Sequence, residues 1–175
     1  MLEKTIGWQF NNTYSKLPES LLSKLNPVPV KMPEKVIFNN SLSKEIGLDF
    51  SKIKDKELAL IFSGNLLPRG SESIAQAYAG HQFGHFTILG DGRATILGEH
   101  ISKKNERFDI QFKGSGKTPY SRNGDGRAAL NPMLREYIIS ESMHSLGVPT
   151  TRSLAVVKTG ETVQREKTLQ GAVLT

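Results

Sequence analysis

The stretch from Gly90 to Glu136 reads GDGRATILGEHISKKNERFDIQFKGSGKTPYSRNGDGRAALNPMLRE, and it decides the predicted fold. Two glycine-punctuated turns each end in an arginine, at 90–93 and 124–127. A strand-like run ends at Lys113, and Glu136 lies one turn into a predicted helix. Backbone N–H groups at glycine turns and a lysine at a strand end can both contact phosphate oxygens. The stretch therefore predicts a site for the phosphates of a nucleotide.

Composition indicates one domain, or a domain with an extension. The chain has 175 residues, 37% of them hydrophobic, and a formal net charge of +6 at pH 7. The charges are scattered and aromatic residues make up only 7%, so binding of nucleic acid is not indicated. The absence of cysteine excludes disulfides, thiolate zinc sites and cysteine nucleophiles within this sequence. No apolar leader or membrane-length run is present, so we expect no membrane contact and a cytoplasmic location.

Residues 1–85 are predicted to form an irregular and partly helical N-terminal extension, because proline motifs interrupt any regular element. The expected elements are one or two helical turns at 19–25, a strand at 36–38, helices at 41–46 and 55–62, and a short helix at 71–78. Asn39 or Asn40 is expected to cap the helix at 41–46, and Gly47 to end it.

Residues 86–175 are predicted to form an antiparallel sheet with one helix, an α+β arrangement. The expected elements are a β-hairpin at 87–89 and 94–99, a strand at 108–112, an irregular segment at 114–130, a helix at 132–146, and strands at 154–157 and 170–174 with a turn at 159–161. Asn131 is the expected N-cap of the helix, and Gly147 lies past its end. This order of elements is that of a protein kinase's small lobe with its αC-type helix.

Glu136 is expected to face the sheet and to pair with Lys113. It shares a helical stripe with Ile139 and Met143, at i+3 and i+7, and a buried carboxylate without a partner is costly. A Lys113–Glu136 pair would satisfy both charges, as the strand lysine and helix glutamate do in kinases. Taken alone, Lys113 is better explained as an ordinary solvated lysine, and Asp91-Gly92 as an ordinary hairpin turn.

Two further patterns resemble known sites but lack required residues. The segment 114–118, GSGKT, resembles a P-loop, but position 111 is glutamine and Pro119 opposes the helix that must follow. His81 and His85 have the i, i+4 spacing of a zinc-binding helix, but Gly84 lies between them and no third ligand is evident. We therefore expect neither site.

Several motifs, in order along the chain, resemble the selenoprotein-O (SelO/YdiU) family. They are YAGHQFG at 78–84, LGDGR at 89–93, FKGSG at 112–116, TPYSR at 118–122, GDGR at 124–127 and RE at 135–136. The resemblance covers essentially the whole chain. It implies a protein-kinase-like pseudokinase that binds its nucleotide in a flipped orientation. Such proteins transfer AMP, or UMP in some accounts, from the triphosphate to hydroxyl side chains (Ser, Thr or Tyr) of proteins.

The resemblance also implies roles for particular residues. The implied nucleotide-binding residues are Gly90, Gly92, Arg93, Lys113, Asp125 and Gly126, with Glu136 orienting the lysine. Arginines at both turns would give forked donors for phosphate oxygens. ATP with Mg²⁺, or Mn²⁺ as the alternative, is the implied cofactor.

The catalytic and metal-binding residues of the family belong to a large lobe that this sequence does not contain. The chain alone is therefore expected to be inactive. The alternatives are a non-catalytic nucleotide-binding or interaction module, and a gene remnant.

Overall fold

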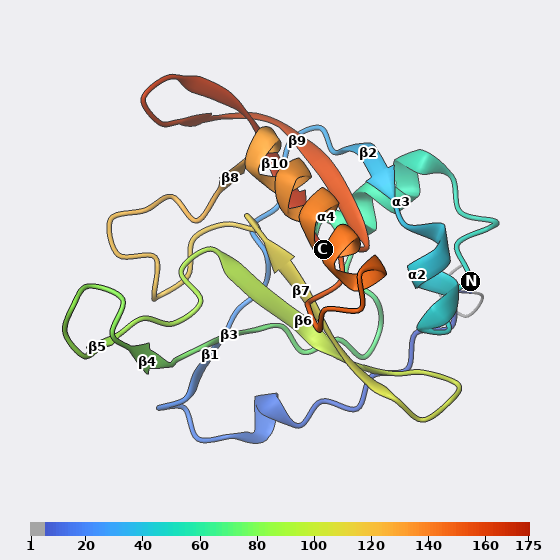
Figure 1. The fold of residues 1–175 in the computed structure, drawn as a ribbon, viewed down its shortest axis with the longest axis horizontal. Helices are drawn as coiled ribbons and strands as arrows, with labels where there is room; N and C mark the ends of the chain where they lie inside the picture. Colours follow the sequence, from blue (N-terminus) through green and yellow to red (C-terminus); the bar gives the residue numbers. More distant parts are fainter. Residues whose placement is uncertain (1–5) are drawn as a thin grey trace.

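The computed structural model describes residues 6–175 and has an α+β fold built on one antiparallel sheet (Figure 1). The eight strands of this sheet are β1 (Leu22–Lys24), β2 (Glu34–Phe38), β3 (Ile74–Gln76), β6 (Ala94–Ile101), β7 (Arg107–Lys113), β8 (Ala128–Ala129), β9 (Ala155–Gln164) and β10 (Thr168–Leu174). Their order is β1-β3-β6-β7-β10-β9-β2, and β8 pairs with β10 off this path. Strands from before residue 86 thus lie in the same sheet as those after it.

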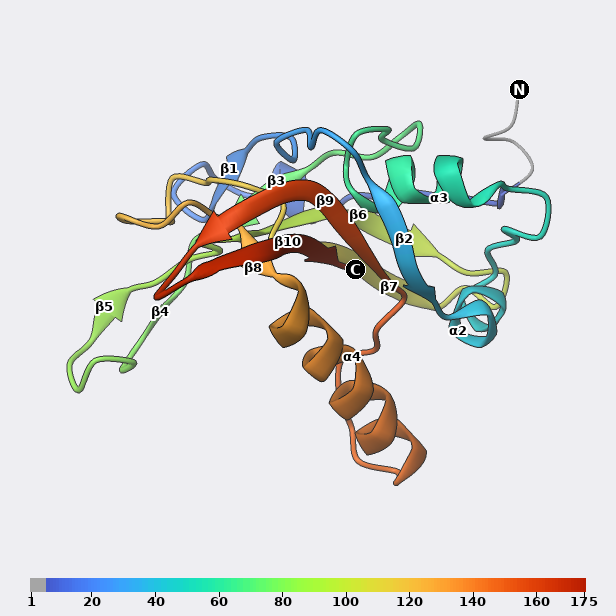
Figure 2. The ribbon, with the colours of Figure 1, turned by 90° about the horizontal axis from the view of Figure 1, so that it is seen from above.

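The helices are α2 (Asn40–Glu45), α3 (Asp55–Phe62) and α4 (Leu130–Ser145), with a 3-10 turn η1 (Tyr14–Lys16). Of these, α3 and α4 lie on opposite faces of the sheet (Figure 2). Successive strand residues point to opposite faces, so Val157 packs in the larger core with α3, while Val156 packs with Met133 of α4. The larger core contains Phe62 and Phe112, both fully buried. It holds the strands that carry the candidate site in a fixed position.

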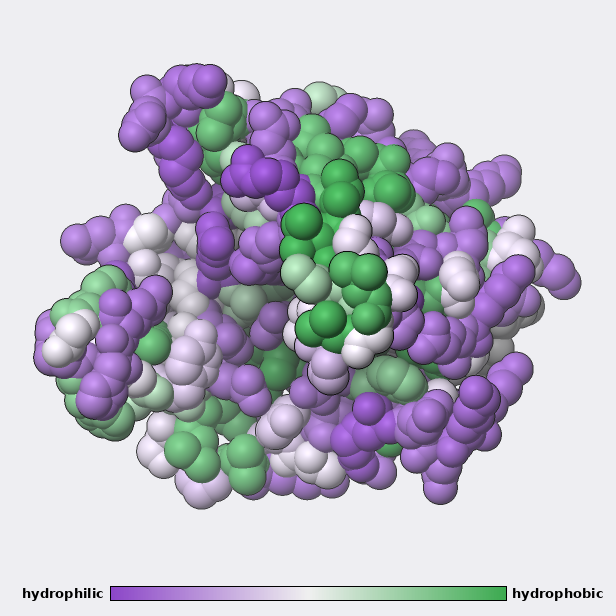
Figure 3. Space-filling view, viewed as in Figure 1, coloured by the Kyte–Doolittle hydropathy of each residue, from purple (hydrophilic) through white to green (hydrophobic). Residues whose placement is uncertain are grey.

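Helix α4 projects from the sheet and packs mainly through its first half (Figure 2). Met133 is fully buried, whereas Ile139 is 54% and Met143 39% exposed. The expected inward stripe through these two residues is therefore wrong, because the sheet ends before the second half of the helix begins. Apolar side chains gather over α4 in Figure 3. The exposed ones on and just after the helix are Ile138, Ile139, Met143, Leu146 and Val148.

The elements with strong local signals follow the sequence expectation. Helix α3 has the predicted bounds, and the predicted strand at 36–38 lies within β2. Asn39 caps α2 by accepting a hydrogen bond from the N–H of Leu42. Gly47 follows α2 with φ +86°, a left-handed conformation that favours glycine.

The two segments predicted to be helical at 19–25 and 71–78 contain no helix and instead hold the short strands β1 and β3. Leu22 pairs with Gln76 and Lys24 with Ile74, so each segment supplies the hydrogen-bond partners of the other. Such pairing between distant segments overrides local helix preference.

The hairpin expected around the turn at 90–93 is also wrong. Strand β5 (Thr87–Ile88) pairs with β4 (Ala79–Gly80) and forms a separate two-stranded arm, while β6 pairs with β3 and β7 (Figure 1). The N–H groups of Leu89 and Gly90 both donate to the carbonyl of Tyr78, which closes the arm before the turn begins. The turn therefore joins the arm to the sheet.

Two boundaries near the C-terminal end differ from expectation. Helix α4 begins at Leu130 with Ala129 as N-cap, two residues before the predicted Asn131 cap, because β8 leads directly into it. Strand β9 continues through Gly160, where a turn was expected, and the ladder to β10 shifts register there. The reversal between β9 and β10 instead lies at residues 165–167.

Candidate functional site

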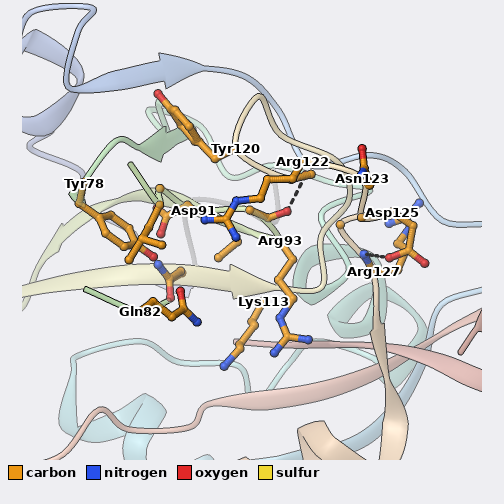
Figure 4. A pocket seen from close by; sticks show the side chains of 18 of the residues that line it. Tyr78, Gln82, Asp91, Arg93, Lys113, Tyr120, Arg122, Asn123, Asp125 and Arg127 are labelled. Carbon is orange, nitrogen blue, oxygen red and sulfur yellow. Dashed lines mark hydrogen bonds between the residues drawn. The ribbon is translucent and has the colours of Figure 1, made fainter. Parts of the chain in front are cut away.

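A cavity of about 890 Å³ lies beside the end of β7, between the two glycine turns (Figure 4). Ligand-binding clefts of proteins have volumes of this order. All six residues implied to bind nucleotide line it, namely Gly90, Gly92, Arg93, Lys113, Asp125 and Gly126. The fold thus brings together two turns that are separated by 30 residues of sequence, 94–123.

The first glycine turn is packed against the loop that contains Tyr120. A Cβ at Gly90, where φ is +69°, would lie 2.4 Å from the Tyr120 ring, and one at Gly92 would lie 2.8 Å from the Tyr120 carbonyl oxygen. Thr118 donates a hydrogen bond from its hydroxyl to the Asp91 carbonyl oxygen at 2.6 Å. These glycines are therefore required by the packing of the two loops, whatever the cavity binds.

Asp91 places a buried carboxyl at the wall of the cavity. It is 7% exposed, and Oδ2 accepts a hydrogen bond from the backbone N–H of Gln76 at 2.9 Å. Burial raises the pKa of this carboxyl, although the Gln76 N–H opposes the rise. The carboxyl ties the turn to β3, a role that the short-range motif did not reveal.

Lys113 and Glu136 form an ion pair between β7 and α4. The Lys113 Nζ atom lies 2.8 Å and 2.7 Å from the two carboxylate oxygens of Glu136. Their side chains are 32% and 39% exposed, so the pair contributes little stability, about 0–1 kcal/mol. Its main consequence is to fix the direction in which the lysine charge points.

Arg93 is exposed and has no hydrogen-bond acceptor or carboxylate partner within residues 6–175. It directly precedes Ala94, which is paired with Lys113 across β6 and β7. Figure 4 shows the Arg93 and Lys113 side chains extending side by side. Two neighbouring cationic groups, one of them without a counter-charge, favour an anion between them.

The charged side chains of the second glycine turn, Asp125 and Arg127, are bound by other residues of the protein. Arg127 donates to the carbonyl oxygens of Val28 at 3.1 Å and Pro29 at 3.3 Å, and lies 3.5 Å from a Glu161 carboxylate oxygen. Asp125 pairs with Arg165, whose hydrogen bonds lower the pKa of the Asp125 carboxyl. Of the two turn arginines, Arg93 is thus the one with a free guanidinium group.

Two lining residues, Gln164 and Arg165, belong to no motif in the sequence and could not be predicted. The cationic residues around the cavity are Arg93, Lys113, Arg122, Arg127 and Arg165, against two carboxylates, those of Asp91 and Asp125. Arg122 has φ +54° and lies over the Phe83 ring at 4.7 Å, which joins its loop to the β4–β5 arm. The excess of positive charge suits a polyanionic ligand such as a polyphosphate.

Within residues 6–175, no group of three or more histidine or acidic side chains is arranged to hold a metal ion. The same part of the chain contains no helix of the length and apolar character needed to cross a membrane.

Comparison with known proteins identifies the family. Residues 4–175 match the family described as "Protein adenylyltransferase SelO". Relatives named "Protein nucleotidyltransferase YdiU" are 68% identical in Pelagibacter ubique (strain HTCC1062) over 98% of this chain and 64% identical in Nitrosococcus oceani over 100% of it. A relative of the same name in Geobacillus kaustophilus is 60% identical over 97% of this chain. The chain spans 35–36% of the length of these relatives, which is about a third. The chain belongs to the SelO family of protein nucleotidyltransferases.

Proposed function

We propose that this chain is the N-terminal, nucleotide-binding portion of a protein nucleotidyltransferase that transfers AMP from ATP to hydroxyl side chains of proteins. The observation that carries the proposal is the cavity in which the free Arg93 guanidinium and the Lys113–Glu136 pair stand beside two glycine turns. Two cations in this position suit phosphate oxygens, and family membership supports the reaction class.

A kinase-like small lobe is the architecture we infer for residues 86–175. It is supported by the antiparallel sheet, by the lysine at the end of β7 and by its pairing with the glutamate of α4. We assign residues 1–85 a supporting role, because they contribute β1, β2 and β3 to the sheet and the strap at 28–29 that holds Arg127. Tyr78 and Gln82 of this part also line the cavity, so the proposed division at residue 85 separates a mainly supporting part from the part that carries the proposed nucleotide-binding residues.

Within the cavity, Arg93 and Lys113 are proposed to bind phosphate oxygens, and Glu136 to orient the lysine. The glycines at 90, 92 and 126 are proposed to let the backbone approach the nucleotide. Binding of the phosphates by cations in fixed positions orders them for attack on the α-phosphorus by a protein hydroxyl group, which loses its proton. The attack forms the new O–P bond, breaks the bond between the α- and β-phosphates and releases pyrophosphate.

The two cavity carboxylates do not fit a site for Mg²⁺ or Mn²⁺. Asp91 accepts a hydrogen bond from the N–H of Gln76, and both oxygens of Asp125 face Arg165. Divalent ions of this kind need several unhindered oxygen ligands. A metal ion that accompanies ATP would therefore take its protein ligands outside residues 6–175.

The test uses the native-length protein and ATP labelled at the α-phosphate. We expect Lys113→Ala to lower transfer of label to protein by about 10²–10³-fold, the usual effect of removing one group that stabilises the transition-state charge. Lys117→Ala is the matched control, because Lys117 is exposed in the next loop and does not line the cavity. Unchanged transfer by a folded Lys113→Ala protein would contradict the assignment.

A non-catalytic nucleotide-binding module is the second candidate, and the cationic lining of the cavity would serve binding alone equally well. It predicts ATP binding that depends on Arg93 and Lys113 but no labelled protein product. Calorimetric titration of ATP and UTP into the same variants separates binding from transfer and reveals the nucleotide preference.

A further inference from the structure

Helix α4 is held against the rest of the protein in two different ways along its length. In the first half, Met133 is fully buried in the core cluster between the helix and the sheet. The second half projects away from the sheet (Figure 2), and its apolar residues Ile139 and Met143 are exposed. The side-chain hydrogen bonds that tie this half to other elements come from Ser140 and Glu141. The position of the second half therefore depends on polar contacts.

The Glu141 carboxylate is bound by two separate parts of the chain. Arg152, just before β9, donates from Nε to Oε1 at 3.0 Å and from Nη2 to Oε2 at 2.9 Å. The backbone N–H of Ser153 donates to Oε1 at 2.9 Å, and Asn39 Nδ2 donates to Oε2 at 2.8 Å. An arginine that binds a carboxylate through two parallel N–H groups fixes the geometry of the pair as well as its charge. Glu141 is thus held in a defined position.

The charge of Glu141 is favoured by these partners. Burial tends to raise the pKa of the carboxyl, but the hydrogen bonds from Arg152 and Ser153 outweigh this effect, and the net pKa is lowered. The side chains of Glu141 and Arg152 are only 21% and 20% exposed. Salt therefore screens this pair less than it screens an ion pair on the open surface.

Arg152 and Asn39 extend the network to both ends of helix α2. The Nη1 atom of Arg152 donates to the two carboxylate oxygens of Glu45, the last residue of α2, at 3.4 Å and 3.2 Å. Asn39 is the N-cap of the same helix, and its Nδ2 atom also donates to the carbonyl oxygen of Ser153 at 3.2 Å. The N-terminal part of the chain thus helps to hold the second half of α4.

The network lies one helical turn from the Lys113–Glu136 pair. Ser140 is four residues after Glu136 and so lies on the same face of α4, and its hydroxyl oxygen is 2.6 Å from that of Ser153. A hollow of about 670 Å³, separate from the cavity at the glycine turns, is lined by Lys113, Glu136, Ser140 and Arg152 together. Because an α-helix moves as a rigid element, contacts at this turn set the position of the turn that carries Glu136.

We propose that Arg152 is a positioning residue, which holds α4 through Glu141 at the tilt and rotation at which Glu136 pairs with Lys113. Arg152 does not line the cavity at the glycine turns, so it acts through the helix and not by contact with the nucleotide. Without the network, α4 is free to tilt about its buried first half, and the lysine loses its fixed direction. The proposal rests on the proposed function, because the direction of Lys113 matters only if this lysine binds phosphate.

The experiment measures steady-state transfer kinetics in the native-length protein. Arg152→Ala and Glu141→Gln should each lower kcat/KM for ATP about tenfold, because misplacement of a group by about 1 Å can cost up to about 10²-fold. The KM for the protein substrate should stay unchanged. In a Glu136→Gln background, Arg152→Ala should lower kcat/KM by less than about twofold, because the ion pair that Arg152 positions is already lost.

Lys158→Ala is the matched control. Lys158 lies on β9 and pairs with Glu34 of β2 at 3.0 Å, so this change breaks an ion pair that does not involve α4. Its kcat/KM should equal that of the wild type. Glu141→Gln tests the same contact from the other side and decides the matter if Arg152→Ala does not fold.

Two results would overturn the proposal. One is multiplication of the effects of Arg152→Ala and Glu136→Gln in the double variant, since Arg152 would then act independently of the ion pair. The other is wild-type kcat/KM in a folded Arg152→Ala or Glu141→Gln protein, even with a lowered Tm, because the network would then serve stability alone. A wild-type protein that transfers no nucleotide would instead overturn the proposed function and this proposal with it, which is a distinguishable result.

Discussion

Replacement of Gly126 by alanine tests whether the second glycine turn is shaped by close backbone contact. A Cβ at this position would lie 2.0 Å from the carbonyl oxygen of Gly116 and 2.4 Å from the backbone nitrogen of Lys117. An ordinary contact begins at 3.4 Å, so the two segments must separate by roughly 1.4 Å in a region with little free space. The change also places alanine at φ +69°, which costs about 1–2 kcal/mol.

Separation of the segments breaks the hydrogen bond from the N–H of Gly116 to the carbonyl of Gly126, now 3.0 Å long. Its loss adds about 1 kcal/mol, so we expect Gly126→Ala to lower the free energy of unfolding by about 2–3 kcal/mol. Displacement of binding groups by about 1 Å can reduce catalysis about 10²-fold. We therefore expect nucleotide transfer to fall by about that factor.

Gly147→Ala provides the control for backbone strain alone. Gly147 has φ +77°, close to that of Gly126, but a Cβ there would meet no atom within 4 Å. It should lose only about 1–2 kcal/mol in urea unfolding and keep wild-type affinity for ATP. The reasoning would be refuted if the two variants lost the same stability and Gly126→Ala bound ATP within twofold of the wild type.

Two buried groups that anchor the N-terminal segment give further predictions. Glu99→Gln removes the charge of a 2%-exposed carboxylate that accepts hydrogen bonds from Thr13 and Arg107. Because Arg107 is itself 39% exposed, we expect a loss of about 1–3 kcal/mol in urea unfolding; a loss of only a few tenths would contradict this. Burial tends to raise the pKa of Glu99, but the hydrogen bonds from Thr13 and the charge of Arg107 outweigh this effect, and the net pKa is lowered. The ionised carboxylate therefore stabilises the fold, and this stabilisation is lost as pH falls below about 4.5. Burial lowers the pKa of His100, whose Nε2 atom lies 2.9 Å from the Ile46 carbonyl oxygen. The fold therefore favours the neutral ring, and the free energy of unfolding should fall as pH drops below about 6.5. His100→Gln should flatten the slope of unfolding free energy between pH 7 and 5, and an unaltered slope would show that another group titrates there.

The residues of the cavity could be predicted because their signals are local. Glycine turns, the alternating run that ends at Lys113 and the caps at Asn39 and Gly47 each depend on neighbours within a few residues. The helical position of Glu136 likewise followed from spacing, and its carboxylate lies against Lys113.

Contacts between distant segments were beyond prediction from the sequence. The segments at 19–25 and 71–78 have helix-forming residues, yet they pair as β1 and β3 because each completes the other's hydrogen bonds. The segment with β4 and β5 forms a separate arm, since the carbonyl of Tyr78 accepts hydrogen bonds from the N–H groups of Leu89 and Gly90.

The sequence by itself determined which residue types stand at the cavity: glycines that permit close backbone approach, and cations that suit phosphate. Only the tertiary structure decided which of those charges are free. Arg127 and Asp125 appear in the same motif as Gly126, but the strap at 28–29 and Arg165 occupy them, whereas Arg93 in the matching motif has no partner within residues 6–175. Ion pairing and hydrogen bonding depend on distance in space, and the residues that bind these two side chains lie 34 to 99 positions away along the chain.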